Sequence, residues 1–215
     1  MPTSRLSEPP DDCARCTRLV ELRQSLQLDH PSWFNAPVPS FGDPNAALLI
    51  VGLAPGLQGA NRTGRPFTGD YAGDLLYATL EKLGLSEGRY DSRPDDGLAL
   101  KGCMITNAVR CLPPQNKPVG AEINNCRPFL DAQISESTTL KAMLALGKIA
   151  HDSVIRTMGA KLKDYPFGHG AVHHLDDGPV LVDSYHCSRY NTNTRRLTPE
   201  MFEEAVASAK GFAGL

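Results

Sequence analysis

Short apolar runs alternate with helical patterns along this 215-residue chain, and this alternation restricts its possible folds more than any other feature. The apolar runs occupy residues 47–51, 103–107, 141–146 and 179–184. Helical spacing follows them at 72–84, 120–132 and 147–158, and from Thr198 onward, where Thr198 is a suitable N-cap and Pro199 a suitable first helical residue. Another helical pattern covers 14–27. Strand–helix alternation predicts a parallel sheet covered on both faces. We therefore expect an α/β fold, a three-layer α/β/α sandwich with a central, mostly parallel four-stranded sheet.

The domain organisation expected from the sequence is simple. Residues 1–11 are polar and predict a flexible leader, and 12–215 predict one domain. Hydrophobic residues make up 41% and charged residues 21%, close to the averages of soluble globular proteins. The first residues lack the apolar core of a secretory signal, and no run is long enough to cross a bilayer. We expect a cytoplasmic protein without a membrane partner.

The charge is nearly balanced, but its distribution is uneven. A net charge of −2 excludes a histone-type polyanion binder. Three segments without acidic residues, 53–69, 103–118 and 184–198, hold the basic residues Arg62, Arg65, Arg110, Lys117, Arg189, Arg195 and Arg196. These segments include the loops after three of the predicted strands, and in such sheets ligands bind at the carboxyl ends of the strands. Convergence there would create one positive face suited to a phosphate backbone. Charge alone leaves a chance distribution equally open.

The cysteines predict a metal site. Cys13 and Cys16 form a C-x2-C pair, and Cys111 and Cys126 flank a proline-rich loop. Without a secretory signal, disulfides are disfavoured, and four thiolates can hold either one zinc ion or an iron–sulfur cluster. The wide second pair favours a cluster that ties the N-terminal helix to the domain, while the spacing leaves the metal itself undecided. Cys103 begins an apolar run and predicts a buried thiol.

Four motifs, in order along the chain, carry a resemblance to a known family. They read GLAPG at 52–56, NRTGRPFTGD at 61–70, ITNAVRCLPP at 105–114 and HCSRYNTNTRRLTPE at 186–200. With the cysteine quartet, they resemble the uracil-DNA glycosylase superfamily, and within it the family 5 branch that carries a 4Fe–4S cluster. Leu53, where family 4 has a carboxylate, and TGDYAG at 68–73 favour family 5. Gly56 and Cys187 depart from the residues expected there.

The resemblance implies a monofunctional DNA glycosylase of base excision repair. Such an enzyme flips uracil, and other deaminated bases such as hypoxanthine and xanthine, into a pocket and hydrolyses the N-glycosidic bond. Because the sequence shows no obvious lysine nucleophile, we do not expect strand cleavage through a Schiff base. The implied partner is damaged DNA, bound by a monomer in the nucleoid-associated cytoplasm of a bacterium or archaeon. The alternatives are a catalytically silent iron–sulfur protein that binds DNA damage, a narrow family 4-like uracil-DNA glycosylase, and a zinc-stapled nucleotide-binding module.

The same resemblance implies roles for individual residues. Asp70 activates or orients the water, although it could instead only cap the helix that follows, and His186 donates a hydrogen bond to the base carbonyl. Phe67 stacks on the base and Asn107 reads its edge, with backbone groups of Ala54 and Gly56 lining the pocket. The predicted DNA contacts are Arg62, Arg65, Ser188, Arg189, Tyr190, Arg195 and Arg196, and the predicted cluster ligands are Cys13, Cys16, Cys111 and Cys126.

The remaining histidines have no comparable sequence setting. His30, His151, His169, His173 and His174 are expected at the surface. The adjacent His173 and His174 suggest a metal pair, but no third ligand is evident in the sequence, so we predict none there.

Overall fold

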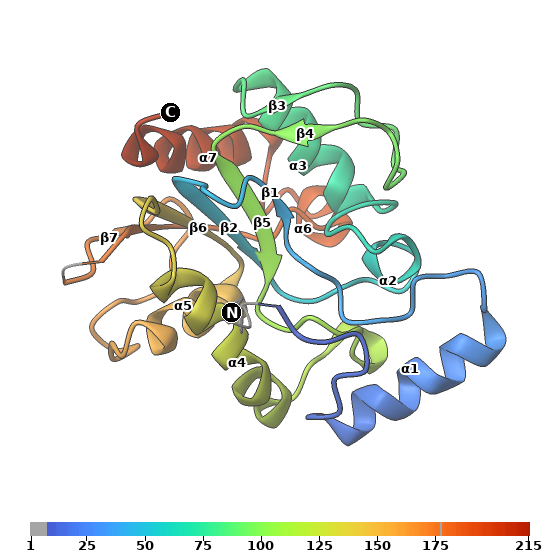
Figure 1. The fold of residues 1–215 in the computed structure, drawn as a ribbon. Coiled ribbons are helices and arrows are strands. Elements are labelled where there is room, and N and C mark those ends of the chain that lie inside the picture. Colours follow the sequence, from blue (N-terminus) through green and yellow to red (C-terminus); the bar gives the residue numbers. More distant parts are fainter. Residues whose placement is uncertain (1–7, 177) are drawn as a thin grey trace.

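A computed structural model describes residues 8–176 and 178–215 and contains a six-stranded sheet between helices (Figure 1). The strand order is β1-β5-β2-β6-β8-β7. The four central strands run parallel, and they are β5 (Cys103–Asn107), β2 (Leu48–Gly52), β6 (Ala142–Leu146) and β8 (Val180–Ser184). The predicted α/β architecture and mostly parallel sheet are confirmed.

The predicted strand number was wrong, because the sheet has six strands rather than four. The two additional strands, β1 (Phe41–Gly42) and β7 (Val172–His173), pair antiparallel at opposite edges. Each has two residues, too few to produce an alternating pattern in the sequence. A separate small hairpin joins β3 (Ser86–Glu87) to β4 (Ala99–Leu100).

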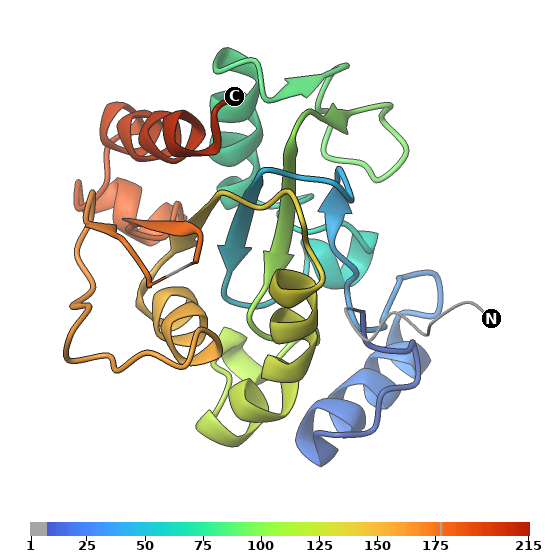
Figure 2. The same cartoon turned by 60° about the vertical axis from the view of Figure 1, so that its left-hand side comes forward.

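Both faces of the sheet are covered, so its central strands are apolar throughout. On β2, Leu48 and Ile50 join the cluster formed with α3 (Tyr71–Lys82) and α7 (Pro199–Ala213). Leu49 and Val51 point the other way, toward α4 (Gly120–Ser135) and α5 (Lys148–Thr157). Figure 2 shows these two helix pairs on opposite sides of the sheet. Thr198 caps α7 as predicted, since its side chain accepts a hydrogen bond from the Met201 amide.

Helix α1 (Thr17–Asp29) lies outside the three layers, beside α4 (Figures 1 and 2). Arg18 forms an ion pair with Glu122 of α4 at 2.7 Å, and the Asn125 side chain donates to the Arg15 carbonyl. The remaining short helical segments are α2 (Ala60–Thr63), a 3-10 turn (Pro114–Asn116) and α6 (Arg189–Asn193).

Only part of the predicted leader belongs to the described residues. Glu8 accepts a hydrogen bond from the Ser40 amide and pairs with Arg110 at 2.9 Å. Residues 1–7 lie outside the described part, so the flexible leader and the single domain over 12–215 stay predictions. Among the described helices, none has the length and apolarity needed to span a membrane.

Candidate active site and cysteine site

The loops that follow β2, β5 and β8 enclose a cavity of about 640 Å³. This size lies in the usual range of small-molecule sites. All three acid-free segments of the sequence contribute to its walls. The lining residues are Leu53, Ala54, Pro55, Gly56, Gln58, Ala60, Phe67, Gly69, Asp70, Tyr71, Ala72, Asn107, Asn116, His186, Ser188 and Arg189.

One residue that lines this cavity carries an unpaired amide oxygen. Asn107, the last residue of β5, is 3% exposed, and its Oδ1 has no hydrogen-bond partner within the described part of the chain. Gly52 makes room for it, because a Cβ on Gly52 would stand 2.4 Å from Asn107 Oδ1 and 2.7 Å from the Phe67 ring. A buried acceptor without a partner is costly, so this oxygen is suited to a donor on a bound ligand.

The two carboxylate oxygens of Asp70 have different surroundings: one caps a helix and the other lies toward the glycines of the cavity loop. Oδ1 caps α3 by accepting a hydrogen bond from the Gly73 amide at 3.0 Å. Oδ2 lies toward Gly56 and Gly59, where added Cβ atoms would stand 3.3 and 2.6 Å away. Among the described residues that line the cavity, Asp70 is the one carboxylate and no lysine is found. The helix cap considered from the sequence is therefore real, and it leaves one oxygen free for other contacts.

His186 follows β8 and lies beside Phe67. The two ring centroids are 5.9 Å apart and the planes differ by 28°. Burial lowers the pKa of His186 below its ordinary value, and the nearby Asp70 partly opposes this shift. The imidazole is therefore neutral near pH 7 and can donate from one nitrogen.

The four cysteines of the predicted metal site meet at a second, small apolar cavity. Cys13, Cys16, Cys111 and Cys126 line it together with side chains of α1, α4 and the loop after β5. All are free thiols. Burial raises the pKa of Cys111 to about 12 and that of Cys126 to about 11. Metal binding would deprotonate them, because thiolates are the ligands.

The spread of the cysteine sulfurs bears on which metal group they fit. A single tetrahedral zinc, with Zn–S bonds of about 2.3 Å, holds its sulfurs about 3.8 Å apart. In the described residues, one group of three or more potential ligands has all its donor atoms within 4.8 Å, and it consists of His151, His173 and Asp183 rather than cysteines. No three of the described cysteine sulfurs therefore lie within 4.8 Å of one another, as the ligands of one zinc ion would.

Comparison with known proteins identifies the family. A family model described as the Uracil DNA glycosylase superfamily matches residues 39–210. The chain belongs to this superfamily. The cavity loops and the carboxyl ends of all four central strands lie inside the matched region.

Curated uracil-DNA glycosylases match most or nearly all of the chain. A type-5 uracil-DNA glycosylase of Thermus thermophilus is 44% identical over 209 residues, covering 94% of each protein. A type-5 uracil-DNA glycosylase of Pyrobaculum aerophilum is 40% identical, covering 94% of this chain and 90% of its own. A type-4 uracil-DNA glycosylase of Sulfurisphaera tokodaii is 30% identical and covers 78% of this chain and 72% of its own. These matches confirm the family 5 resemblance of the sequence.

The basic side chains of this glycosylase-family chain divide into exposed and buried sets. Those of Arg62, Lys117, Arg189, Arg195 and Arg196 are exposed. Tyr190 is 73% exposed on α6, which Ser188 caps through a bond from the Asn191 amide. Arg189 also lies over the Tyr71 ring, 5.4 Å from its centroid.

Two of the predicted basic surface residues are not at the surface. Arg65 was predicted to contact DNA, but its side chain is 4% exposed and binds Asp96 with both terminal nitrogens, at 2.8 and 2.7 Å. Arg110, expected on the same positive face, is 1% exposed and pairs with Glu8. The prediction that these two side chains face DNA was wrong, because buried guanidinium groups engaged with carboxylates cannot reach a phosphate.

Sequence reasoning missed several cavity residues, among them Asn116 and Tyr71. Asn116 has a left-handed backbone with φ 56°, as has the preceding Gln115. Asparagine tolerates this conformation, so the Asn after PPQ was a usable but weak signal.

The histidine prediction was wrong for His151 and His173, which are buried. Their ring nitrogens lie 2.8 and 2.9 Å from the two oxygens of Asp183. His173 and His151 of α5 thus contact the same carboxylate, that of Asp183 on β8, and His173 does not form a pair with its neighbour His174. Both Asp183 oxygens are engaged at hydrogen-bond distance, so we interpret this group as a buried polar network.

Proposed function

We propose that this protein is a monofunctional DNA glycosylase that removes uracil from DNA by hydrolysing its N-glycosidic bond. The observation that carries this proposal is the unpaired Asn107 Oδ1 beside Phe67, in a cavity with Asp70 and His186. The names of the type-5 and type-4 relatives support uracil in DNA as the substrate.

Each cavity residue has a role in the proposed reaction. The flipped uracil stacks on Phe67, and its N3–H donates to Asn107 Oδ1. Backbone groups of Ala54 and Gly56 complete the pocket wall. Neutral His186 donates a hydrogen bond to a base carbonyl that gains charge as the bond breaks.

The bond changes balance without a covalent enzyme intermediate. The C1′–N1 electron pair leaves with the uracil anion, and the oxygen of one water bonds to C1′. Asp70 Oδ2 orients this water and stabilises the positive charge on the sugar, and the proton passes through Asp70 to solvent. Because no lysine lines the described cavity, a Schiff base and strand cleavage are not part of the proposal.

DNA reaches this cavity across the exposed basic side chains. Arg62, Arg189, Arg195 and Arg196 contact phosphates, while Ser188 and the exposed Tyr190 enter the gap left by the flipped base. The protein acts as a monomer on chromosomal DNA in the cytoplasm. Hypoxanthine and xanthine are further substrates, since a cavity of about 640 Å³ leaves room for a purine.

Cys13, Cys16, Cys111 and Cys126 hold a 4Fe–4S cluster in this proposal. The four free thiols share one cavity, and their spread suits a cluster better than one zinc ion. When bound, the cluster supplies a structural cross-link between α1 and the loop and helix that follow β5.

The test uses an oligonucleotide with one uracil opposite guanine, followed by alkaline cleavage. We expect strand breaks at the uracil with the wild-type protein and their loss with Asp70→Asn, while affinity for the same DNA is retained. Asp74→Asn is the matched control. It removes the same charge from an exposed position of α3, four residues after Asp70. Binding without breaks in the wild type would favour the silent damage-binding alternative. Equal loss of binding and cleavage in Asp70→Asn would contradict the role of Asp70.

A further inference from the structure

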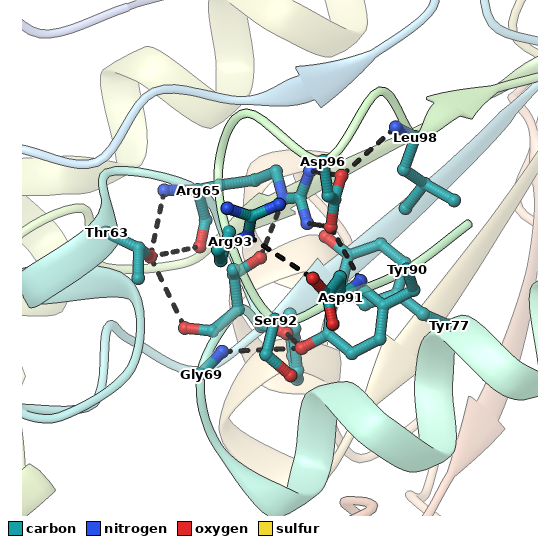
Figure 3. Close-up of polar contacts among 12 residues, drawn as sticks. Thr63, Arg65, Gly69, Tyr77, Tyr90, Asp91, Ser92, Arg93, Asp96 and Leu98 are labelled. Atoms are coloured by element: carbon teal, nitrogen blue, oxygen red, sulfur yellow. Dashed lines mark hydrogen bonds and ion pairs between the residues drawn. The ribbon is translucent and has the colours of Figure 1, made fainter. Parts of the chain in front are cut away.

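A buried polar cluster, drawn in Figure 3, contacts the backbone of residues 66–69, which leads to the cavity residue Asp70. Its centre is the ion pair between Arg65 and Asp96, whose side chains are 4% and 1% exposed. Arg65 Nε also donates to Thr68 Oγ1 at 2.8 Å. Its guanidinium lies over the Phe41, Tyr77 and Tyr90 rings, 5.0, 5.5 and 5.7 Å from their centroids.

This cluster holds the backbone of the cavity wall at successive residues. Tyr77 donates to the Pro66 carbonyl at 2.7 Å. The Tyr90 hydroxyl donates to the Phe67 carbonyl and accepts from the Gly69 amide, each at 3.3 Å. One hydroxyl therefore bridges the residues on both sides of Thr68, directly before Asp70.

The backbone that Tyr90 bridges is strained. Phe67 has φ 54°, a left-handed conformation that a bulky side chain rarely adopts. The wall also presses against α3, because a Cβ on Gly73 would stand 1.8 Å from the Phe67 carbonyl oxygen. Strained conformations persist only where the surroundings hold them, and they cluster at functional sites.

Tyr90 itself is fixed by the ion pair. It stacks on Tyr77 with centroids 4.5 Å apart, and Asp96 accepts from the Asp91 and Leu98 amides of the same loop. The loop between β3 and β4, which contributes no residue to the cavity, thus reaches the cavity wall from behind.

We propose that Tyr90 is a positioning residue for base excision, with the Arg65–Asp96 pair holding it in place. Its hydroxyl fixes residues 67–70 so that the Phe67 ring and Asp70 Oδ2 face the cavity together. This inference rests on the proposed function.

The experiment compares Tyr90→Phe with Tyr77→Phe. Both variants lose one hydroxyl from the same aromatic stack, but only Tyr90→Phe frees the Phe67 carbonyl and the Gly69 amide. We expect Tyr90→Phe to lower the single-turnover rate of uracil excision by about 10- to 100-fold, because small displacements of reacting groups are costly. Its affinity for DNA carrying non-hydrolysable 2′-fluorodeoxyuridine should stay near the wild-type value. Tyr77→Phe frees only the Pro66 carbonyl, outside the segment that Tyr90 bridges, and should lower the rate clearly less than Tyr90→Phe does.

A second measurement is independent of catalysis. The Gly69 amide should exchange its hydrogen faster in Tyr90→Phe than in wild type or Tyr77→Phe. Unchanged excision and unchanged Gly69 exchange in Tyr90→Phe would overturn the positioning role while leaving the proposed function intact. A rate loss that follows thermal stability equally in both variants would also overturn it. A wild-type protein that does not excise uracil would overturn the proposed function and this inference with it.

Discussion

At the scale of single residues, the cavity depends on polar side chains that belong to the structure of a helix or strand and still have an oxygen atom without a hydrogen-bond partner among the described residues. Asp70 caps α3 with one oxygen and directs the other toward Gly56 and Gly59. Asn107 ends β5 with an amide oxygen that nothing in the described protein satisfies. Glycines make these placements possible, since a side chain at Gly52 or Gly59 would occupy the same space. The chemistry therefore depends as much on absent Cβ atoms as on polar groups.

His186 allows a prediction of rate. Replacing His186 with alanine removes a hydrogen-bond donor from the charge that develops on the departing base. We expect the single-turnover rate of excision to fall by about 10²- to 10³-fold, with little change in DNA affinity. A decrease in this rate smaller than threefold would contradict the role assigned to His186. The departing base would then be stabilised by other contacts, such as those of Asn107 and Phe67.

The same histidine sets a direction for stability against pH. Because burial lowers the pKa of folded His186, the unfolded chain binds the proton first as pH falls. The contribution of neutral His186 is complete above the unfolded value, about 6.5, and is lost as pH falls below it. Urea unfolding of wild type and His186→Ala at pH 7.5 and 5.5 measures this, and we expect the smaller pH effect in the variant.

At the scale of elements, α5 is joined to the sheet by a buried polar connection as well as by apolar packing. His151 of α5 contacts Asp183 of β8 through one ring nitrogen and the Tyr165 carbonyl through the other, at 2.8 and 2.9 Å. The Gly168 amide also donates to Asp183. This connection fixes the loop at 165–170 against β8, the strand that leads to His186.

Breaking that connection should cost stability. We expect His151→Phe to reduce the free energy of unfolding by about 3–5 kcal/mol, because it leaves a buried carboxylate oxygen without its partner. His174→Phe makes the same substitution at an exposed position and serves as the control. It should change the free energy of unfolding little. Chemical denaturation measures both. A loss below about 1 kcal/mol in His151→Phe would show that the site relaxes without its histidine.

At the scale of the whole molecule, the cysteine site lies between the three-layer sandwich and helix α1, which packs outside it. Helix α1 packs outside the sandwich, and it meets α4 through the Arg18–Glu122 pair, polar contacts around Asn125 and a small apolar cluster that contains Leu19 and Phe129. The polar links are partly exposed, and exposed ion pairs contribute little. The proposed cluster would add a covalent cross-link to this small interface.

Loss of one ligand should release α1. If the proposed cluster is present in the wild type, we expect purified Cys111→Ser to lack its broad visible absorption and its iron, and to be cut by protease within 17–29. The matched control is Cys103→Ser, which alters a buried core thiol outside the quartet and should keep the iron. Wild-type iron content in Cys111→Ser, or one zinc per wild-type chain, would contradict the cluster proposal.

Local sequence determined the four central strands, the main helices and the motif loops at the carboxyl ends of the strands. Apolar runs, helical spacing and caps such as Thr198 are short-range signals, so they survive without knowledge of the fold. The side-chain environments were decided only by the tertiary structure. Arg65 is buried against Asp96, 31 residues away, and Arg110 against Glu8, 102 residues away. His151 meets Asp183 across 32 residues. A charged side chain is buried only where folding supplies its partner, and the sequence near that residue carries no record of a partner so distant.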